Sequence, residues 1–166
     1  MRNIKLGETG RRLTKYKCYI GFYDFSKLQG KFFGTLAKIC GLSNITHVGP
    51  IILIPGVGEI SITICEGKIV DGFYKTTARV HKEGVLERTG AVLVHRKYVG
   101  EFVFDLEDVM RRAETYTDAH PWDILFHQFI GRFLGLTRPR ACSSFVCDLF
   151  KLQEYWHPAS IYRKYK

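Results

Sequence analysis

The spacing of hydrophobic residues changes along the chain, from mostly strand-like patterns in the first two thirds to a helical periodicity in the last third. Apolar runs, continuous or alternating and rich in β-branched and aromatic residues, predict strands. The expected strands cover residues 17–25, 46–54, 59–65, 69–80 and 91–96, with turns at residues 55–58, 67–68 and 100.

Apolar residues at helical spacing predict helices at residues 26–42, 105–116, 122–136 and 142–156. Asp105 is placed to cap the second of these helices. The buried face of the last helix is expected to hold Phe145, Val146, Leu149, Phe150 and Leu152. This order of elements predicts an α+β fold, with a mostly antiparallel sheet packed against helices.

Length and composition suit a single domain. With 166 residues, 46% of them hydrophobic, the chain can bury one core and has little room for two. We expect a domain at residues 17–156, a basic arm at 1–16 and a basic, aromatic tail at 157–166. No run approaches the roughly 18 apolar residues of a membrane span, and no secretory signal is recognisable. These features predict a cytoplasmic protein, or a virion-associated one if the chain is of phage or viral origin.

The net charge of +9 is concentrated at the two ends of the chain. It favours an anionic partner, which could be a cell-wall polymer, a lipid or nucleic acid. The other interpretation is a basic surface without a dedicated partner. Five cysteines, an odd number without a CxxC pair, argue against a disulfide framework and a zinc site. We expect neither a metal nor a cofactor.

Cys142 is the sharpest chemical signal, because it follows the helix-breaking segment TRPRA and opens the last predicted helix. Free backbone N–H groups and the helix dipole at such a position favour a thiolate over a thiol. The same N–H groups can bind an oxyanion that develops beside the sulfur. The other interpretation is a buried structural cysteine. Cys147, five residues later, falls on the apolar face and is expected to fill the core.

A thiol nucleophile needs a group that accepts its proton. His47 is the first choice because it opens an apolar strand, where its ring could turn toward a neighbouring helix N-terminus. The alternative for His47 is a satisfied polar residue at a strand end, and His127 is then the second choice as base. His81 and His95 have charged neighbours and are predicted to lie on the surface.

A third group is expected to orient the imidazole and fix its tautomer. Glu66 ends the predicted strand that follows the strand of His47, so a hairpin could bring the two together. Glu59 begins the same strand, and antiparallel pairing would place it nearer the far end. Glu66 is therefore preferred, and the alternative for either glutamate is a solvated charge.

Together these segments resemble a known family. SKLQGKFFGTLAKICGLSNITHVGPIIL is similar to the start of circularly permuted papain-like hydrolases, in which a helix leads to an HVG motif that opens a strand. HPWDILF and CSSFVCDLF are similar to the family's aromatic–Asp segment and its cysteine helix. The group includes the YiiX-like proteins and is related to NlpC-type cell-wall peptidases and lecithin retinol acyltransferase. Pro50 and Ser144 depart from the family pattern.

The resemblance implies a single-domain permuted papain-like fold with a Cys142–His47–Glu66 triad. It also implies a thiol hydrolase or acyltransferase that attacks an amide or ester through an acyl-enzyme, on a cell-wall peptide or lipid substrate. The alternative is a non-catalytic module, such as a virion component, that keeps the fold and uses its basic ends for binding. Interleaved aromatic and basic residues in the tail favour nucleic acid in that case.

Overall fold

The computed structural model describes residues 5–6, 12–24, 43–70, 73–82, 91–116, 142–152 and 158–165, and the positions 35, 38–39, 130 and 134. For residues 5–6, 12, 65–70 and 73–79 it describes the backbone alone. The strands are β1 (Lys5–Leu6), β2 (Arg12–Asp24), β3 (His47–Ile54), β4 (Gly58–Val70), β5 (Phe73–Lys82) and β6 (Val92–Phe104). The main helices are α3 (Leu106–Glu114), α5 (Cys142–Leu149) and α6 (Pro158–Tyr165).

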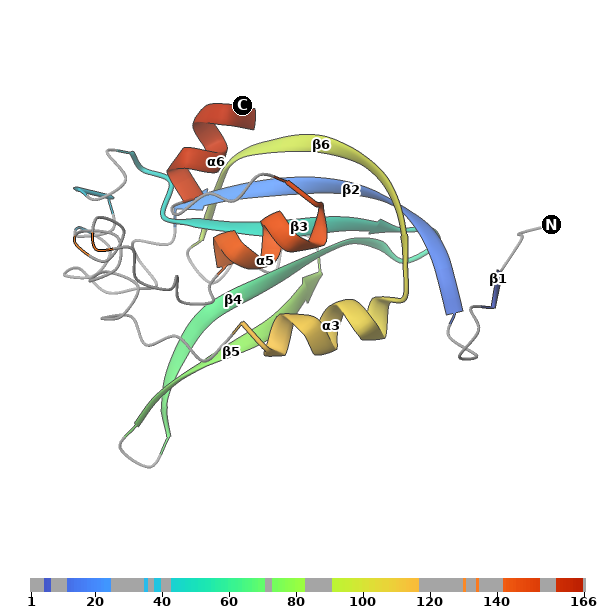
Figure 1. The fold of residues 1–166 in the computed structure, drawn as a ribbon, viewed down its shortest axis with the longest axis horizontal. Coiled ribbons are helices and arrows are strands. Elements are labelled where there is room, and N and C mark those ends of the chain that lie inside the picture. The colour runs from blue at the N-terminus through green and yellow to red at the C-terminus, as the bar shows by residue number, and fades with distance from the viewer. Residues whose placement is uncertain are drawn as a thin grey trace.

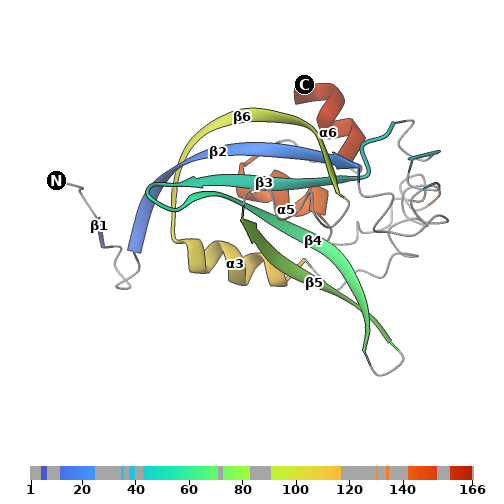
Figure 2. The ribbon, with the colours of Figure 1, turned by 180° about the vertical axis from the view of Figure 1, so that it is seen from behind.

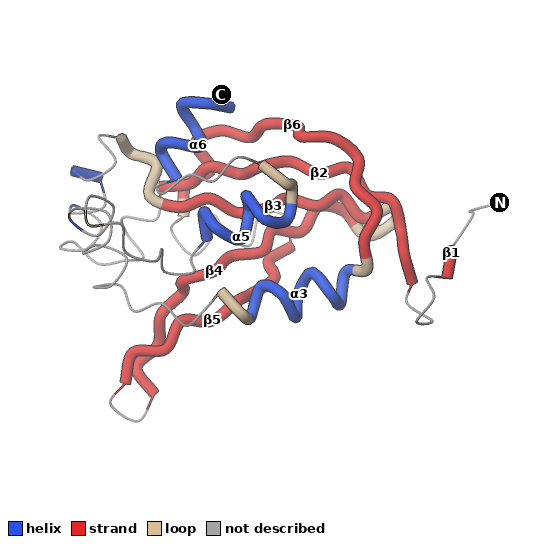
Figure 3. The backbone as a smooth tube through the Cα atoms, in the orientation of Figure 1, coloured by secondary structure: helices blue, strands red, loops and turns tan. Residues whose placement is uncertain are grey.

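The long strands form an antiparallel sheet in the order β6-β2-β3-β4-β5, and the short β1 pairs with the start of β2. Helices α3 and α5 lie on one face of this sheet (Figure 1), and seen from behind the strands lie in front of them (Figure 2). Figure 3, coloured by secondary structure, shows helices α3 and α5 beside the strands of the sheet. The predicted α+β class with an antiparallel sheet is confirmed.

The main core lies between the sheet and the helices. Successive side chains of a strand point to opposite faces, so one set of alternate residues in each strand meets the helices. In β2 this set is Tyr16, Cys18, Ile20 and Phe22, all buried in one cluster with Phe145 and Val146 of α5 and Ile161 of α6. The predicted buried face of the last helix is confirmed for Phe145, Val146, Leu149 and Phe150, whereas Leu152 is only partly buried and α5 itself ends at Leu149.

Three of the predicted strands are longer in the structure, and two predicted turns are wrong. β4 continues through residues 67–68 and pairs with β5, after a register shift between Thr63 and Glu66. β6 likewise continues through Gly100, which has a φ of 131° beside a register shift opposite Cys18. Glycine adopts this φ without the Cβ clash that other residues meet, so it absorbs a bulge where the sequence suggested a turn. The single strand predicted for 69–80 is split between β4 and β5.

The two ends of the chain contribute more to the fold than expected. β2 begins at Arg12, so residues 12–16 of the predicted arm belong to the sheet, and Tyr16 is buried. The predicted tail contains α6, whose Ala159 and Ile161 are fully buried. The helices predicted for 26–42 and 122–136 and the TRPRA break lie largely or wholly outside the described residues.

The predicted N-cap of α3 is confirmed, because the Asp105 carboxylate accepts a hydrogen bond from the backbone N–H of Glu107 at 2.9 Å. Among the described residues, no helix combines the length and the apolar run that crossing a membrane requires.

Candidate active site

Cys142 is the first residue of α5 and is almost fully buried, with 8% of its surface exposed. The first backbone N–H groups of an α-helix have no partner within the helix, so they surround this position with donors. The next two residues, Ser143 and Ser144, are also buried. The structure thus confirms that a cysteine opens the helix, which is the feature that made Cys142 the candidate nucleophile.

Helix α5 has a defined direction across the sheet. At its far end, the ring of Phe150 packs on Phe102 of β6 at 5.0 Å, and Phe102 pairs with Tyr16. The neighbouring Lys17 pairs with Leu53, near the last residues of β3. The beginning of α5 therefore lies toward the beginning of β3, as Figures 1 and 3 show. Cys142 and His47, which open these two elements, share one end of the sheet.

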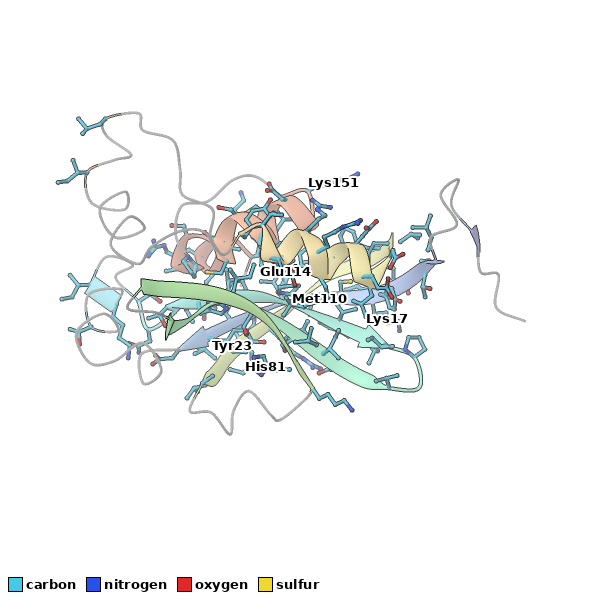
Figure 4. All side chains as sticks on the ribbon, turned by 90° about the horizontal axis from the view of Figure 1, so that it is seen from below. Lys17, Tyr23, His81, Met110, Glu114 and Lys151 are labelled. Atoms are coloured by element: carbon cyan, nitrogen blue, oxygen red, sulfur yellow. The ribbon has the colours of Figure 1, made fainter. Side chains whose placement is uncertain are left out.

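The side chain of His47 lies on the other face of the sheet. Its ring centroid is 6.1 Å from that of Tyr23, the residue paired with it across β2 and β3. Tyr23 belongs to a second buried cluster with Ile51 and Ala91, separate from the core that contains Cys142. Figure 4 shows Tyr23 on the side of the sheet away from the helices. Val48, the residue after His47, is the one that points into the main core.

The structure therefore does not bring the imidazole of His47 and the sulfur of Cys142 together on one face. The physical reason is the period of two along β3: once Val48 packs under α5, His47 must point away from it. His47 is nevertheless only 1% exposed. The prediction that its ring turns toward the helix N-terminus is not supported by this arrangement.

Glycines explain how His47 and Tyr23 fit on their face. Gly21 and Gly49 pair directly across β2 and β3. A Cβ on Gly21 would lie 2.4 Å from the hydroxyl of Tyr23, and one on Gly49 would lie 2.6 Å from the carbonyl oxygen of Ile62. The glycine of the HVG motif is thus required by the close approach of β4. Nε2 of His47 lies over the same residue, 3.8 Å from that Cβ position.

Pro50 fits this local geometry. It pairs with Ile20 of β2, while the recorded pairing of β3 with β4 starts one residue later, at Ile51 and Ser61. The missing N–H of proline therefore falls where the ladder to β4 stops. The sequence suggested an edge strand or a bulge at this position, and β3 is instead an inner strand whose ladder is incomplete on one side.

The two candidate glutamates lie in different parts of β4. Glu66 is inside the strand rather than at its end, pairs with Thr77, and follows the register shift. Glu59 pairs with Leu53, at the end of β3 far from His47, and its carboxylate accepts two hydrogen bonds from Arg96 at 2.9 and 3.0 Å. Glu59 is therefore excluded as the residue that orients His47, while Glu66 stays a prediction.

Two polar contacts on the same face of the sheet as His47 were not predicted from the sequence. The hydroxyl of Thr63 and Nε2 of His81 are 3.0 Å apart, and the hydroxyls of Tyr23 and Ser61 are 3.2 Å apart. Contrary to the prediction of a surface residue, His81 is 8% exposed. The alternation in EISITIC places Ser61 and Thr63 on one face, and this was the signal available in the sequence.

His95 is also not a surface residue. It is half-buried, and its ring forms a cluster with those of Phe22 and Tyr162, at centroid distances of 6.1 and 5.8 Å. It thus joins β6 to α6 over the core.

The other described cysteines behave as core residues. Cys147 is 1% exposed, which confirms the prediction that it fills the core. Cys18 is fully buried, and burial raises the pKa of its thiol to about 12, although a backbone hydrogen bond involving Phe102 acts in the opposite direction. A thiol with this pKa is not a nucleophile near neutral pH. Among the described residues, no group of three or more histidine, cysteine or acidic side chains could hold a metal ion.

Comparison with known proteins adds no name to this geometry. No family model matches the chain, and neither the curated proteins nor the solved structures contain a match to it.

Proposed function

We propose that this chain is a thiol hydrolase or acyltransferase of the permuted papain-like type, with Cys142 as its nucleophile. The observation that carries the proposal is the position of Cys142 at the first residue of a sheet-packed helix. The thiolate would attack the carbonyl of an amide or ester and expel the amine or alcohol, leaving an acyl group on the sulfur. Water or an amine would then resolve this thioester.

The helix supplies two effects to such a step. Its partial positive charge favours the thiolate, and backbone N–H groups in its first turn can stabilise the negative oxygen of the tetrahedral intermediate. Both effects come from the backbone, so neither requires His47. The nucleophile is thus assigned without its base. The candidates for the group that accepts the proton of Cys142 are His47 and His127, and the activities of the two histidine variants would distinguish them.

The test is labelling with an acylating probe directed at thiols, followed by peptide mass mapping. We expect the peptide that contains Cys142 to carry an adduct in the folded wild type, and the corresponding peptide of Cys142→Ala to carry none. Cys147→Ala is the matched control, because Cys147 is a buried cysteine of the same helix. The Cys147→Ala variant should be labelled at Cys142 to the same extent as the wild type. Equal labelling of Cys142→Ala and wild type would falsify the assignment.

A second function is favoured by the separation of His47 from Cys142 across the sheet. A papain-like domain without a working base would be a binding module, for example a virion component with an anionic partner. Hydrolysis distinguishes the two. A wild-type protein that binds anionic polymers but releases no product from thioester, ester or amide substrates, at any pH where it stays folded, supports the binding module.

A further inference from the structure

One end of the sheet combines exposed apolar and basic side chains around a surface hollow. We call this end the basic tip. It lies where β2 and β6 pass beside the turn between β3 and β4, at the end of the sheet where β1 pairs with β2 (Figure 1). The hollow has a volume of about 680 Å³ and is lined by Lys15, Lys17, Leu53, Ile54, Pro55, Gly56, Val57, Gly58 and Glu101.

The apolar residues of the basic tip are exposed to solvent. Val57, in the turn after β3, is 63% exposed, and its neighbours Pro55 and Gly56 are exposed as well. Val103 of β6 is 60% exposed and pairs with Lys15 of β2. Membrane-binding surfaces combine exposed apolar side chains with neighbouring basic residues. The apolar side chains insert at the boundary between lipid headgroups and acyl chains.

The charge of the basic tip fits an anionic surface. Lys15 and Lys17 point to the sheet face away from the helices, where Lys17 is exposed (Figure 4). Glu101 forms an ion pair with Lys15 at 2.5 Å, which leaves the local charge positive. Residues 1–17 carry six lysines and arginines against one glutamate, and the described parts of this stretch, β1 and the start of β2, pair with each other at the same end.

From these observations we propose that the basic tip docks the protein on an anionic lipid bilayer. Val57 and Val103 enter the interface, while the lysines lie among the headgroups. Nucleic acid fits this surface less well, because no aromatic ring for base stacking is found among the described residues that line the hollow. The proposal does not depend on Cys142.

The experiment is co-sedimentation of the full chain with vesicles of phosphatidylcholine alone or phosphatidylcholine mixed with phosphatidylglycerol. We expect binding to the mixed vesicles only, with an affinity that falls as salt is added. Lys17→Gln should weaken binding about fivefold, the usual contribution of one basic residue near an anionic membrane. Val57→Asp should weaken it at least as much.

The matched control is Val92→Asp. Val92 is a valine of β6 that is 50% exposed at the opposite end of the sheet, where it pairs with Asp24. The Val92→Asp variant should bind the mixed vesicles as strongly as the wild type does. Binding of Val57→Asp at wild-type strength would overturn the proposal and indicate charge attraction alone. So would equal binding of the wild type to both vesicle types, or to neither. Cys142→Ala should bind vesicles normally, which separates this proposal from the catalytic one.

Discussion

The two faces of the sheet differ in what they bury. The face under the helices is an apolar core that contains Cys18, Cys142 and Cys147. The other face buries histidine and tyrosine rings and hydroxyl groups, with Tyr23 and His47 on the glycines of β2 and β3. His47 and Gly49 of the HVG motif therefore lie on the opposite face of the sheet from the CSSFVC helix, while Val48 packs in the core with that helix. Close packing of the β4 backbone holds the glycine of the HVG motif in place, whereas the cysteine of the CSSFVC motif is held at the start of a helix that packs on the core.

The largest effect should come from the helix-covered face. Phe145→Ala removes a ring that is 1% exposed and packs against Tyr116 at 5.5 Å, so we expect a loss of about 3–5 kcal/mol in the free energy of unfolding. Tyr98→Ala, on the other face, removes a ring that is 50% exposed and touches Tyr19, and should cost about 1 kcal/mol. Urea unfolding measures both. Equal losses would mean that the two faces are not distinct in burial.

A smaller effect should come from the glycines of the other face. Gly49→Ala places its Cβ against the backbone carbonyl of Ile62, which cannot move alone, so we expect a loss of about 1–3 kcal/mol. Gly21→Ala meets the end of the Tyr23 side chain, which can shift, and should cost less. Thermal unfolding of both variants tests this order. A Gly49→Ala protein as stable as the wild type would contradict the close approach of β4.

The smallest effect should come from the exposed edge of the same face. Arg96 binds Glu59 and lies 5.0 Å from the centre of the Tyr19 ring, but half of its side chain is exposed. Solvent screens such a pair, so Arg96→Ala should cost less than about 1 kcal/mol, and the difference should shrink in high salt. Lys97→Ala, the neighbouring residue, is the control. A loss of several kcal/mol at Arg96 would show that this edge carries more of the fold than its exposure indicates.

Much of the fold could be predicted from the sequence, because alternation and capping are local signals. β3, the cap at Asp105 and the buried face of α5 follow from such signals. The extensions of β4 and β6 could not be predicted in this way. Glycine marks turns and bulges alike, and only the partner strand decides between them.

The candidate site was predictable one residue at a time, but not as an arrangement. Cys142 was placed correctly at a helix start, whereas the contacts of His47 depend on which face of β3 packs under α5. The THVG motif alone does not determine which of the two faces this is, since Val48 and His47 are both compatible with a buried position. His81 was missed because its sequence neighbours are polar, while its buried partner Thr63 lies on another strand.

We expect Cys142 to be an activated thiol that lies on the face of the sheet opposite to His47. The most direct measurement is the rate of Cys142 alkylation by limiting iodoacetamide, followed by mass spectrometry across a range of pH. The structure predicts that Cys142 reacts first near neutral pH, that Cys18 and Cys147 stay unmodified, and that His47→Gln leaves the pH profile unchanged. A profile displaced toward higher pH in His47→Gln, and unaffected in His127→Gln, would contradict the separation of His47 from Cys142.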